Sequence, residues 1–411
     1  MSTSSTFGRR AAPPAQPSRV EAARAWTPPT PRVASPAPIA LDAPTGFDKT
    51  PYLSIGLLTL LALIFIFQPT AGLPMGPGME MSLHNLMAVG GVSRDLVFKE
   101  GEWWRIFTAP LLHANTAHIV GNAGVMAFAA ITLERVVGRS WLAAAFVVSA
   151  IGGSLFSMLL NRGEIVSVGA SGAIMGLLAM ILMCSLHPAM HEHAKRLRWI
   201  TVRLFVPSLI PFGAAMGSTT DYNCHLGGAV AGGVLGFLLL ATWEEDSDNP
   251  RQSRLLWGLG ALGLGLAVLA FGLVATRHQT YVARGRPLVP DFMLPQKGWA
   301  SEQNAMALVA AYPRDPRAHL QMAHAYIEAE NYVNAERELR LALAEREILT
   351  RDMPATLEPM MHHLLVGVLA KEQRYDAAID EARALCKQRP TDDPLKEMDK
   401  RLRATGLCER V

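Results

Sequence analysis

Apolar residues gather into seven long stretches in the first two thirds of the chain, and none of these stretches contains Asp, Glu, Lys or Arg. A helix needs about 20 apolar residues to cross the hydrocarbon of a bilayer, and somewhat fewer when its ends reach the headgroups. The pattern therefore predicts a bundle of membrane-spanning helices. The stretches are Tyr52–Phe67, Ala117–Leu133, Trp141–Leu160, Ala170–Leu186, Leu204–Gly217, Leu226–Trp243 and Leu255–Thr276.

The remaining segments differ from one another in composition. Residues 1–50 are rich in Pro, Ala, Ser and Arg, which predicts a disordered tail. An arginine-rich mitochondrial transit peptide is the alternative, and the frequent prolines argue against it. We expect residues 51–277 to form a membrane domain, residues 278–297 to form a linker, and residues 298–405 to form a charged, soluble helical region.

Two windows in this C-terminal region repeat one pattern of small and aromatic residues. Tyr332 and Ala335 in the first window correspond to Tyr375 and Ala378 in the second. These offsets are typical of packed helix–turn–helix pairs and resemble tetratricopeptide repeats; a generic alanine-rich hairpin is the alternative. About three repeats are usually needed for stability. Two repeats therefore suggest support from flanking helices, self-association or a protein partner.

Composition and charge agree with a membrane protein and exclude other classes. Half of the residues are hydrophobic, and a net charge of +3 gives no reason to expect nucleic acid. The four cysteines lack metal-ligand spacing, so we expect free thiols, no metal and no cofactor. Lys and Arg are more frequent in the segments that face the cytoplasm if the N-terminus is inside. This bias predicts a cytoplasmic N-terminus and, with seven spans, an external C-terminus.

A few polar side chains interrupt the predicted spans, and all lie near the outer ends. They are His118, Asn122, Ser171 and His225. Polar groups at membrane depth are costly and are usually functional or paired. Each has a structural interpretation when taken alone, as a backbone-bonded hydroxyl or an interhelical contact. Together they provide a nucleophile, a base that titrates near neutrality and an amide for an oxyanion.

Glycines at four-residue spacing accompany the serine and the second of these histidines. Small residues at this spacing let membrane helices approach closely, as a direct serine–histidine hydrogen bond requires. Gly169 precedes Ser171 and lets the backbone open a loop that presents an N–H group. The spaced glycines are Gly172 and Gly176 on the serine helix and Gly228, Gly232 and Gly236 on the histidine helix.

These motifs resemble the signatures of the rhomboid intramembrane serine proteases. GASGAIMG around Ser171 resembles the GxSG motif of the family, HIVGN its HxxxN motif, and CHLGGAVAG its HxxGxxxG motif. The resemblance covers about residues 52–276. It implies an all-α fold, a polytopic membrane helical bundle with a six-span core and a seventh span, followed here by the soluble helical repeats.

Carried over to this sequence, the resemblance implies a catalytic dyad of Ser171 and His225. Asn122, His118 and the backbone at Gly169 would stabilise the oxyanion. The first-loop pair Trp104 and Arg105 would anchor its loop in the membrane interface. The residues implied to support the site are Trp104, Arg105, His113, Glu134, Gly172, Gly228 and Gly232.

The match to the family pattern is incomplete at two points. Met175 stands where relatives often have an aromatic residue that packs on the histidine. Methionine can fill such a gap, so we expect altered packing rather than lost activity. The seventh span is not universal in the family.

The sequence thus predicts an intramembrane serine endopeptidase that cleaves transmembrane segments of membrane proteins within a lipid bilayer, in a bacterial plasma membrane. A polar cavity that opens outward would admit water. The alternatives are an inactive rhomboid-like binder of membrane proteins, which the intact Ser171 and His225 disfavour, and a membrane-anchored repeat scaffold, for which one span would suffice. Zinc and aspartyl proteases fit worse, because the chain lacks an H-E-x-x-H motif and an acidic pair within its spans.

Overall fold

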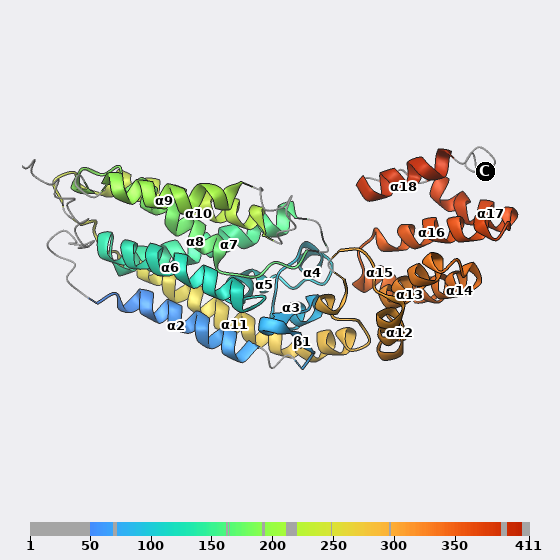
Figure 1. Cartoon of the computed structure of the whole chain (residues 1–411). Helices are drawn as coiled ribbons and strands as arrows, with labels where there is room; N and C mark the ends of the chain where they lie inside the picture. The colour runs from blue at the N-terminus through green and yellow to red at the C-terminus, as the bar shows by residue number, and fades with distance from the viewer. Residues whose placement is uncertain are drawn as a thin grey trace, which may run out of the picture. The chain divides into compact units, whose positions relative to one another are not determined.

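The structure, a computed structural model, describes residues 50–68, 72–161, 163, 165–190, 194–210, 220–247, 249–295, 297–387 and 393–404. Within these residues the chain is mostly helical, which confirms the predicted all-α class. Seven helices described in the N-terminal part run side by side in a bundle (Figure 1). They are α2 (Tyr52–Phe67), α6 (Thr116–Val136), α7 (Arg139–Leu160), α8 (Ser171–Cys184), α9 (Ala194–Leu209), α10 (Tyr222–Thr242) and α11 (Arg254–Gly285).

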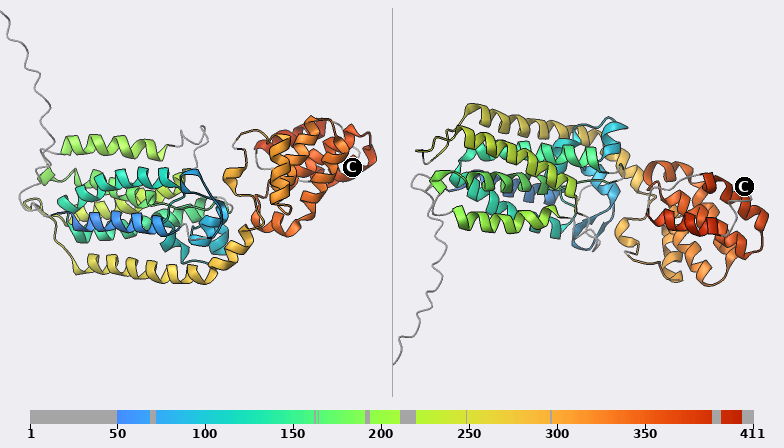
Figure 2. Two further views of the ribbon diagram at one scale, coloured as in Figure 1. Left: turned by 60° about the horizontal axis from the view of Figure 1, so that its bottom comes forward. Right: turned by 90° about the horizontal axis from the view of Figure 1, so that it is seen from above.

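Helix α8 forms the core of the bundle. All its residues from Gly172 to Ile181 are buried, and the helix packs against α6, α7, α9 and α10. Figure 2 places α9 and α11 at opposite edges of the bundle. Because neighbouring helices enclose α8, a polar side chain at its end is kept away from lipid.

Glycines lie where α8 and α10 approach each other most closely. A Cβ atom added to Gly228 would collide with the carbonyl oxygen of Gly172, and one added to Gly232 would collide with that of Gly176. Only glycine fits between the two backbones at these levels. The contact fixes the height of the first turn of α8 relative to that of α10.

The helices agree with most of the predicted spans but not with the fifth. By length and composition, α6, α7, α10 and α11 can cross a membrane, and α2 and α8 are shorter apolar helices. The fifth stretch, Leu204–Gly217, does not have the predicted bounds, because α9 begins at Ala194 and includes the charged Arg198 and Arg203. Residues 211–217 of that stretch lie outside the described residues.

The segment between α2 and α6 is folded into short elements that the hydropathy pattern did not reveal. Strands β1 (Met75–Gly76) and β2 (Glu80–Met81) form an antiparallel hairpin in which Met75 pairs with Met81 and Gly76 with Glu80. The short helices α3 (Leu83–Val89), α4 (Arg94–Phe98) and α5 (Arg105–Thr108) follow.

Arg105 is buried inside this segment and holds it together. Its side chain is fully inaccessible and donates to Glu102 at 2.5 Å and to the carbonyl oxygens of Met87 and Gly91 at 2.7 and 2.9 Å. The Tyr281 hydroxyl of α11 donates to Glu102 at 3.0 Å, and its ring centroid lies 4.8 Å from the guanidinium carbon. These partners compensate the buried charge. Arg105 therefore joins the loop to α11.

Glu134 joins three helices at the opposite end of the bundle. Its carboxylate accepts from the backbone N–H groups of Leu53 and Ser54 at 3.1 and 2.7 Å and from the Ser54 hydroxyl at 2.6 Å. Arg139 pairs with it at 3.0 Å. N–H groups in the first turn of a helix have no intrahelical partner, so the carboxylate caps α2.

The C-terminal part contains further helices that pack in pairs. Helix α13 packs against α14 and α16 against α17, so each predicted window is a helical hairpin. Ala335 and Ala378 are fully buried in them. Tetratricopeptide repeats and generic hairpins both agree with this packing. The helices are α12 (Glu302–Ala311), α13 (Pro316–Glu328), α14 (Tyr332–Ala344), α15 (Arg346–Asp352), α16 (Leu357–Lys371), α17 (Tyr375–Lys387) and α18 (Asp393–Ala404).

Three further predictions concern the linker, the cysteines and the N-terminal tail. Helix α11 continues past Thr276 to Gly285, into the segment predicted to be a linker. Cys184 and Cys224 are buried free thiols, whereas Cys386, in α17, is disulfide-bonded, so the expectation of free thiols is wrong there. The predicted disordered tail lies outside the described residues except for its last residue, Thr50.

Candidate active site

Ser171 is the first residue of α8 and follows a loop that is tied to the rest of the fold. The Gly169 N–H group donates to the carbonyl oxygen of Ala109 at 2.9 Å, and Ser167 forms an isolated β-bridge with Val92. Gly169 has a φ of +123°, a conformation that favours glycine. The loop thereby turns into α8 and leaves half-buried Ser171 at the helix N-terminus.

The first turn of α8 lies against the first turn of α10. A Cβ atom added to Gly172 would lie 2.8 Å from the Cys224 sulfur and 3.2 Å from its carbonyl oxygen. Ser171 and His225 are the chain neighbours of these two residues. The fold therefore brings together two segments that are far apart in the sequence, with the serine on one and the histidine on the other.

His225 is buried between three elements of the bundle. Its Nδ1 atom lies 2.6 Å from the carbonyl oxygen of Ser208 on α9. The ring of Tyr222, one turn earlier on α10, meets the imidazole edge to face with centroids 6.2 Å apart. Met175, which stands where relatives often have an aromatic residue, is buried in α8. The aromatic neighbour of His225 thus comes from its own helix.

His118 and Asn122 of α6 line the loop that leads to Ser171. A Cβ atom added to Gly169 would lie 2.7 Å from His118 Cε1 and 3.4 Å from Asn122 Nδ2. The two α6 residues are four positions apart, so they share a helix face. The amide of Asn122 and the imidazole of His118 therefore lie beside Gly169, two residues before Ser171 in the sequence, and leave room there only for glycine.

His113 holds the Asn122 side chain in place. The Asn122 amide donates to His113 Nε2 at 3.1 Å, so that nitrogen is unprotonated. Burial, with a smaller contribution from His118, lowers the pKa of His113 to about 3, which keeps the ring neutral at physiological pH. The Gln68 side chain accepts from the His113 N–H group at 3.2 Å and donates to its carbonyl oxygen. Gln68 therefore supports Asn122 through His113.

Asp221 fixes the first turn of the His225 helix. One carboxylate oxygen accepts from the Cys224 N–H group at 2.9 Å. The other accepts from Ser157 Oγ at 2.5 Å and from Asn161 Nδ2 at 2.9 Å, at the end of α7. Asp221 lies just outside the predicted spans and was not among the predicted site residues, although aspartate directly before a helical pattern is a common N-cap signal.

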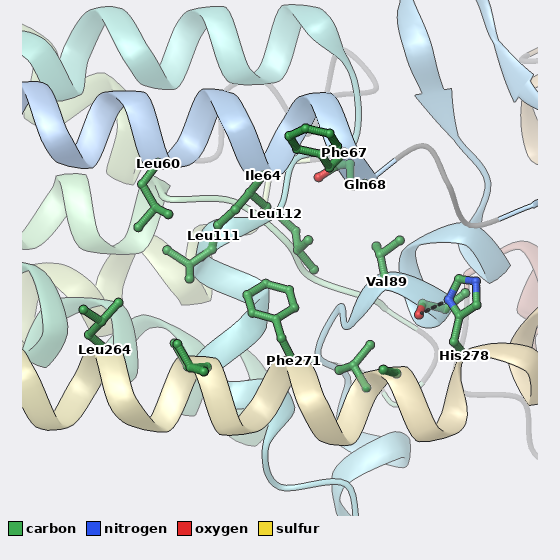
Figure 3. A pocket seen from close by; sticks show the side chains of 15 residues that line it. Leu60, Ile64, Phe67, Gln68, Val89, Leu111, Leu112, Leu264, Phe271 and His278 are labelled. Atoms are coloured by element: carbon green, nitrogen blue, oxygen red, sulfur yellow. Dashed lines mark hydrogen bonds between the residues drawn. The ribbon is translucent and has the colours of Figure 1, made fainter.

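A large apolar pocket lies on another side of the bundle, between α2 and α11 (Figure 3). It encloses about 560 Å³, and Leu60 and Phe271 are among its lining residues. His278 lines one end and donates to the carbonyl oxygen of Ala88 at 3.0 Å. Ser171, His225, His118 and Asn122 do not line this pocket, so it is not the candidate catalytic site.

Comparison with known proteins agrees with the motifs at this site. Residues 100–242 match the Rhomboid domain, and this range includes all four polar residues of the predicted site. RHOMBOID-like protein 5 of Arabidopsis thaliana is 35% identical over 188 residues, which cover 45% of this chain and 58% of that protein. RHOMBOID-like protein 1 of the same plant is 32% identical over 191 residues, which cover 46% and 47%.

A bacterial protein matches the same part of the chain. Rhomboid protease GluP of Bacillus subtilis (strain 168) is 28% identical over 203 residues, covering 49% of this chain and 38% of that protein. The chain spans about half the length of the curated relatives it matches. Because plant and bacterial proteins both match, the similarity does not single out a bacterial plasma membrane. The apolar helices make this chain a multi-pass membrane protein, and its residues 100–242 are similar to the Rhomboid domain.

Proposed function

We propose that this protein is an intramembrane serine endopeptidase that cleaves peptide bonds in or beside the transmembrane segments of other membrane proteins. The observation that supports this most is the contact between Gly172 and Cys224, the chain neighbours of Ser171 and His225. A hydroxyl becomes an effective nucleophile when a nearby base takes its proton. Two matched relatives carry the name rhomboid protease.

In the proposed reaction, His225 takes the proton of Ser171 Oγ while the oxygen attacks the carbonyl carbon of the scissile bond. The protonated imidazole then gives this proton to the leaving amine, and a water molecule hydrolyses the acyl-enzyme with the same base. The side chains of Asn122 and His118 and the backbone N–H of Ser171 would stabilise the oxyanion, beside the space left by Gly169. The water requires the predicted polar cavity on the outer side.

Two other functions compete with proteolysis. An inactive rhomboid-like binder would keep the fold without needing Ser171 and His225, and both are present. A membrane-anchored scaffold would not need a neutral, buried His113 to hold the Asn122 amide beside the serine loop. The arrangement of polar groups around Gly169 therefore favours the enzyme.

A cleavage assay tests the proposed function. The purified full chain is reconstituted into liposomes with a single-span substrate that has small, helix-destabilising residues near one membrane boundary. We expect mass spectrometry to locate the cut within or beside the span, and the Ser171→Ala protein serves as the control for contaminating proteases. Cleavage that the control reproduces, or cuts confined to soluble segments of the substrate, would contradict the proposal.

We also propose that the N-terminus is cytoplasmic and that the C-terminal helices lie outside, where they meet external parts of substrates or a protein partner. The distribution of Lys and Arg supports this orientation, and so does the disulfide at Cys386, since disulfides persist mainly in oxidising compartments. Protease added to sealed cells should remove the C-terminal helices and spare a tag at residue 1. Protection of the C-terminal helices until the membrane is opened would contradict this orientation.

A further inference from the structure

The two ring nitrogens of His225 have different environments, and this difference selects one tautomer. Nδ1 lies 2.6 Å from the carbonyl oxygen of Ser208. A carbonyl oxygen only accepts, so in the neutral ring Nδ1 must carry the hydrogen and donate it. Nε2 is then left with its lone pair free, which is the form that a base for Ser171 needs.

The acceptor belongs to the end of a helix, which adds an electrostatic effect. Helix α9 ends at Leu209, so the Ser208 carbonyl is among the last four, which have no partner within the helix. These carbonyls also form the negative end of the helix dipole, which stabilises a nearby cation. The Ser208 hydroxyl donates to the Leu204 carbonyl oxygen at 2.8 Å, so it is engaged within α9. The helix end is therefore suited to stabilise an imidazolium at His225.

Among the described residues, no charged or titratable neighbour of His225 is hydrogen-bonded to its Nδ1 atom. Asp221, on the same helix, uses its two oxygens for the Cys224 N–H group and for side chains of α7. His118 of α6 is itself a histidine and has no negative charge to offer. Tyr222 meets the imidazole with its ring rather than with a hydrogen bond. The Ser208 carbonyl is thus the group that orients Nδ1.

We propose that α9, through the backbone carbonyl of Ser208, orients His225 and supports its charged form, as a carboxylate does in a Ser–His–Asp triad. This proposal rests on the proteolytic function proposed above. Ser208 is a positioning residue that acts through the histidine. Since the acceptor is a backbone atom, the identity of the side chain at 208 matters little, whereas the position of the end of α9 decides whether His225 is ready to act.

Replacing one amide with an ester tests this proposal without changing any side chain. The α-hydroxy acid analogue of Leu209 turns the Ser208 carbonyl into an ester carbonyl, which is a weaker hydrogen-bond acceptor. We expect kcat to fall roughly tenfold with KM unchanged, since general-base catalysis contributes about 10²–10⁴-fold and is only partly lost. The acidic limb of the pH–rate profile should move to lower pH, because the protonated imidazole loses more stabilisation than the neutral ring.

The matched control is the same ester at Ile210, which alters the Leu209 carbonyl and removes one backbone N–H group from the same helix end. We expect its kcat and pH profile to stay close to those of the unmodified protein. Equal effects of the two esters, or an effect on KM or thermal stability alone, would overturn the role of Ser208. If the unmodified protein does not cleave at all, the proposed function fails instead.

A measurement that needs no catalysis gives a second test. Nitrogen-15 NMR of the protein with labelled histidine, compared with His225→Gln to assign the signals, reports which ring nitrogen carries the proton. We expect a protonated Nδ1 and an unprotonated Nε2 at neutral pH, and a changed Nδ1 signal in the Leu209 ester. A ring protonated on Nε2 would overturn the proposal.

Discussion

Replacing Ser171 with alanine should lower the rate of intramembrane cleavage by at least about 10⁴-fold, and His225→Ala should do nearly the same. The serine hydroxyl has no substitute once removed, because the acyl-enzyme forms on its oxygen. Without the imidazole, no good base is left to take the proton of the hydroxyl, because water is a much weaker base than histidine. Initial rates of cleavage in liposomes measure both effects.

The double variant separates catalysis from general damage. When two residues act as one unit, the effects of replacing them are strongly non-additive. The double variant Ser171→Ala/His225→Ala should therefore cleave no more slowly than the less active of the two single variants. Thermal stability of Ser171→Ala should stay unchanged, because the side chain is only half-buried at the first position of α8. If the fold-losses in rate of the two single variants multiplied in the double variant, the two residues would not share one mechanism.

Gly228→Ala should separate the serine and histidine segments and have the largest effect among changes remote from the chemistry. The added methyl group would collide with the Gly172 carbonyl oxygen, which belongs to the backbone and cannot rotate away. Overpacking of this kind costs about 1–3 kcal/mol of stability. A displacement of about 1 Å at the reacting groups costs about 10²-fold in rate, so kcat should fall by that amount.

The same helix offers a matched control for this change. A Cβ atom added to Gly233 has its nearest neighbour, the Ala179 Cβ, at 4.0 Å, so Gly233→Ala fits without movement. We expect its activity to match that of the unmodified protein, with equal or slightly higher thermal stability, since alanine favours the helix over glycine. Similar losses of kcat in Gly228→Ala and Gly233→Ala would show that activity does not depend on the close contact of α8 with α10.

The sequence was sufficient for the features that depend on side-chain type and spacing. Long apolar stretches predicted the bundle because the bilayer imposes both length and polarity on a helix. The spacing of Gly228 and Gly232 pointed to a close helix contact, because a missing side chain is visible in the sequence and is what such a contact requires. The sequence also predicted that Ser171 and His225 lie on spans that meet, and α8 and α10 pack against each other.

Other features depend on backbone groups and on tertiary packing, which no pattern of residue types in the sequence reveals. The partner of His225 is the carbonyl of Ser208, and every residue has a carbonyl. Helix α9 begins ahead of its apolar stretch because basic residues continue the helix, so hydropathy misplaced its start. Gln68 supports Asn122 only through His113, a relay that becomes visible once the loop is folded.

The central claim is that His225 activates Ser171 as a nucleophile, and covalent labelling tests it most directly. A fluorophosphonate is attacked by an activated serine oxygen with loss of fluoride, and mass spectrometry of the digested protein locates the adduct. We predict an adduct on Ser171 Oγ in the unmodified protein, none at this site in Ser171→Ala, and at least about 10²-fold slower labelling in His225→Ala. An adduct on a different serine, or undiminished labelling of Ser171 without His225, would contradict the claim.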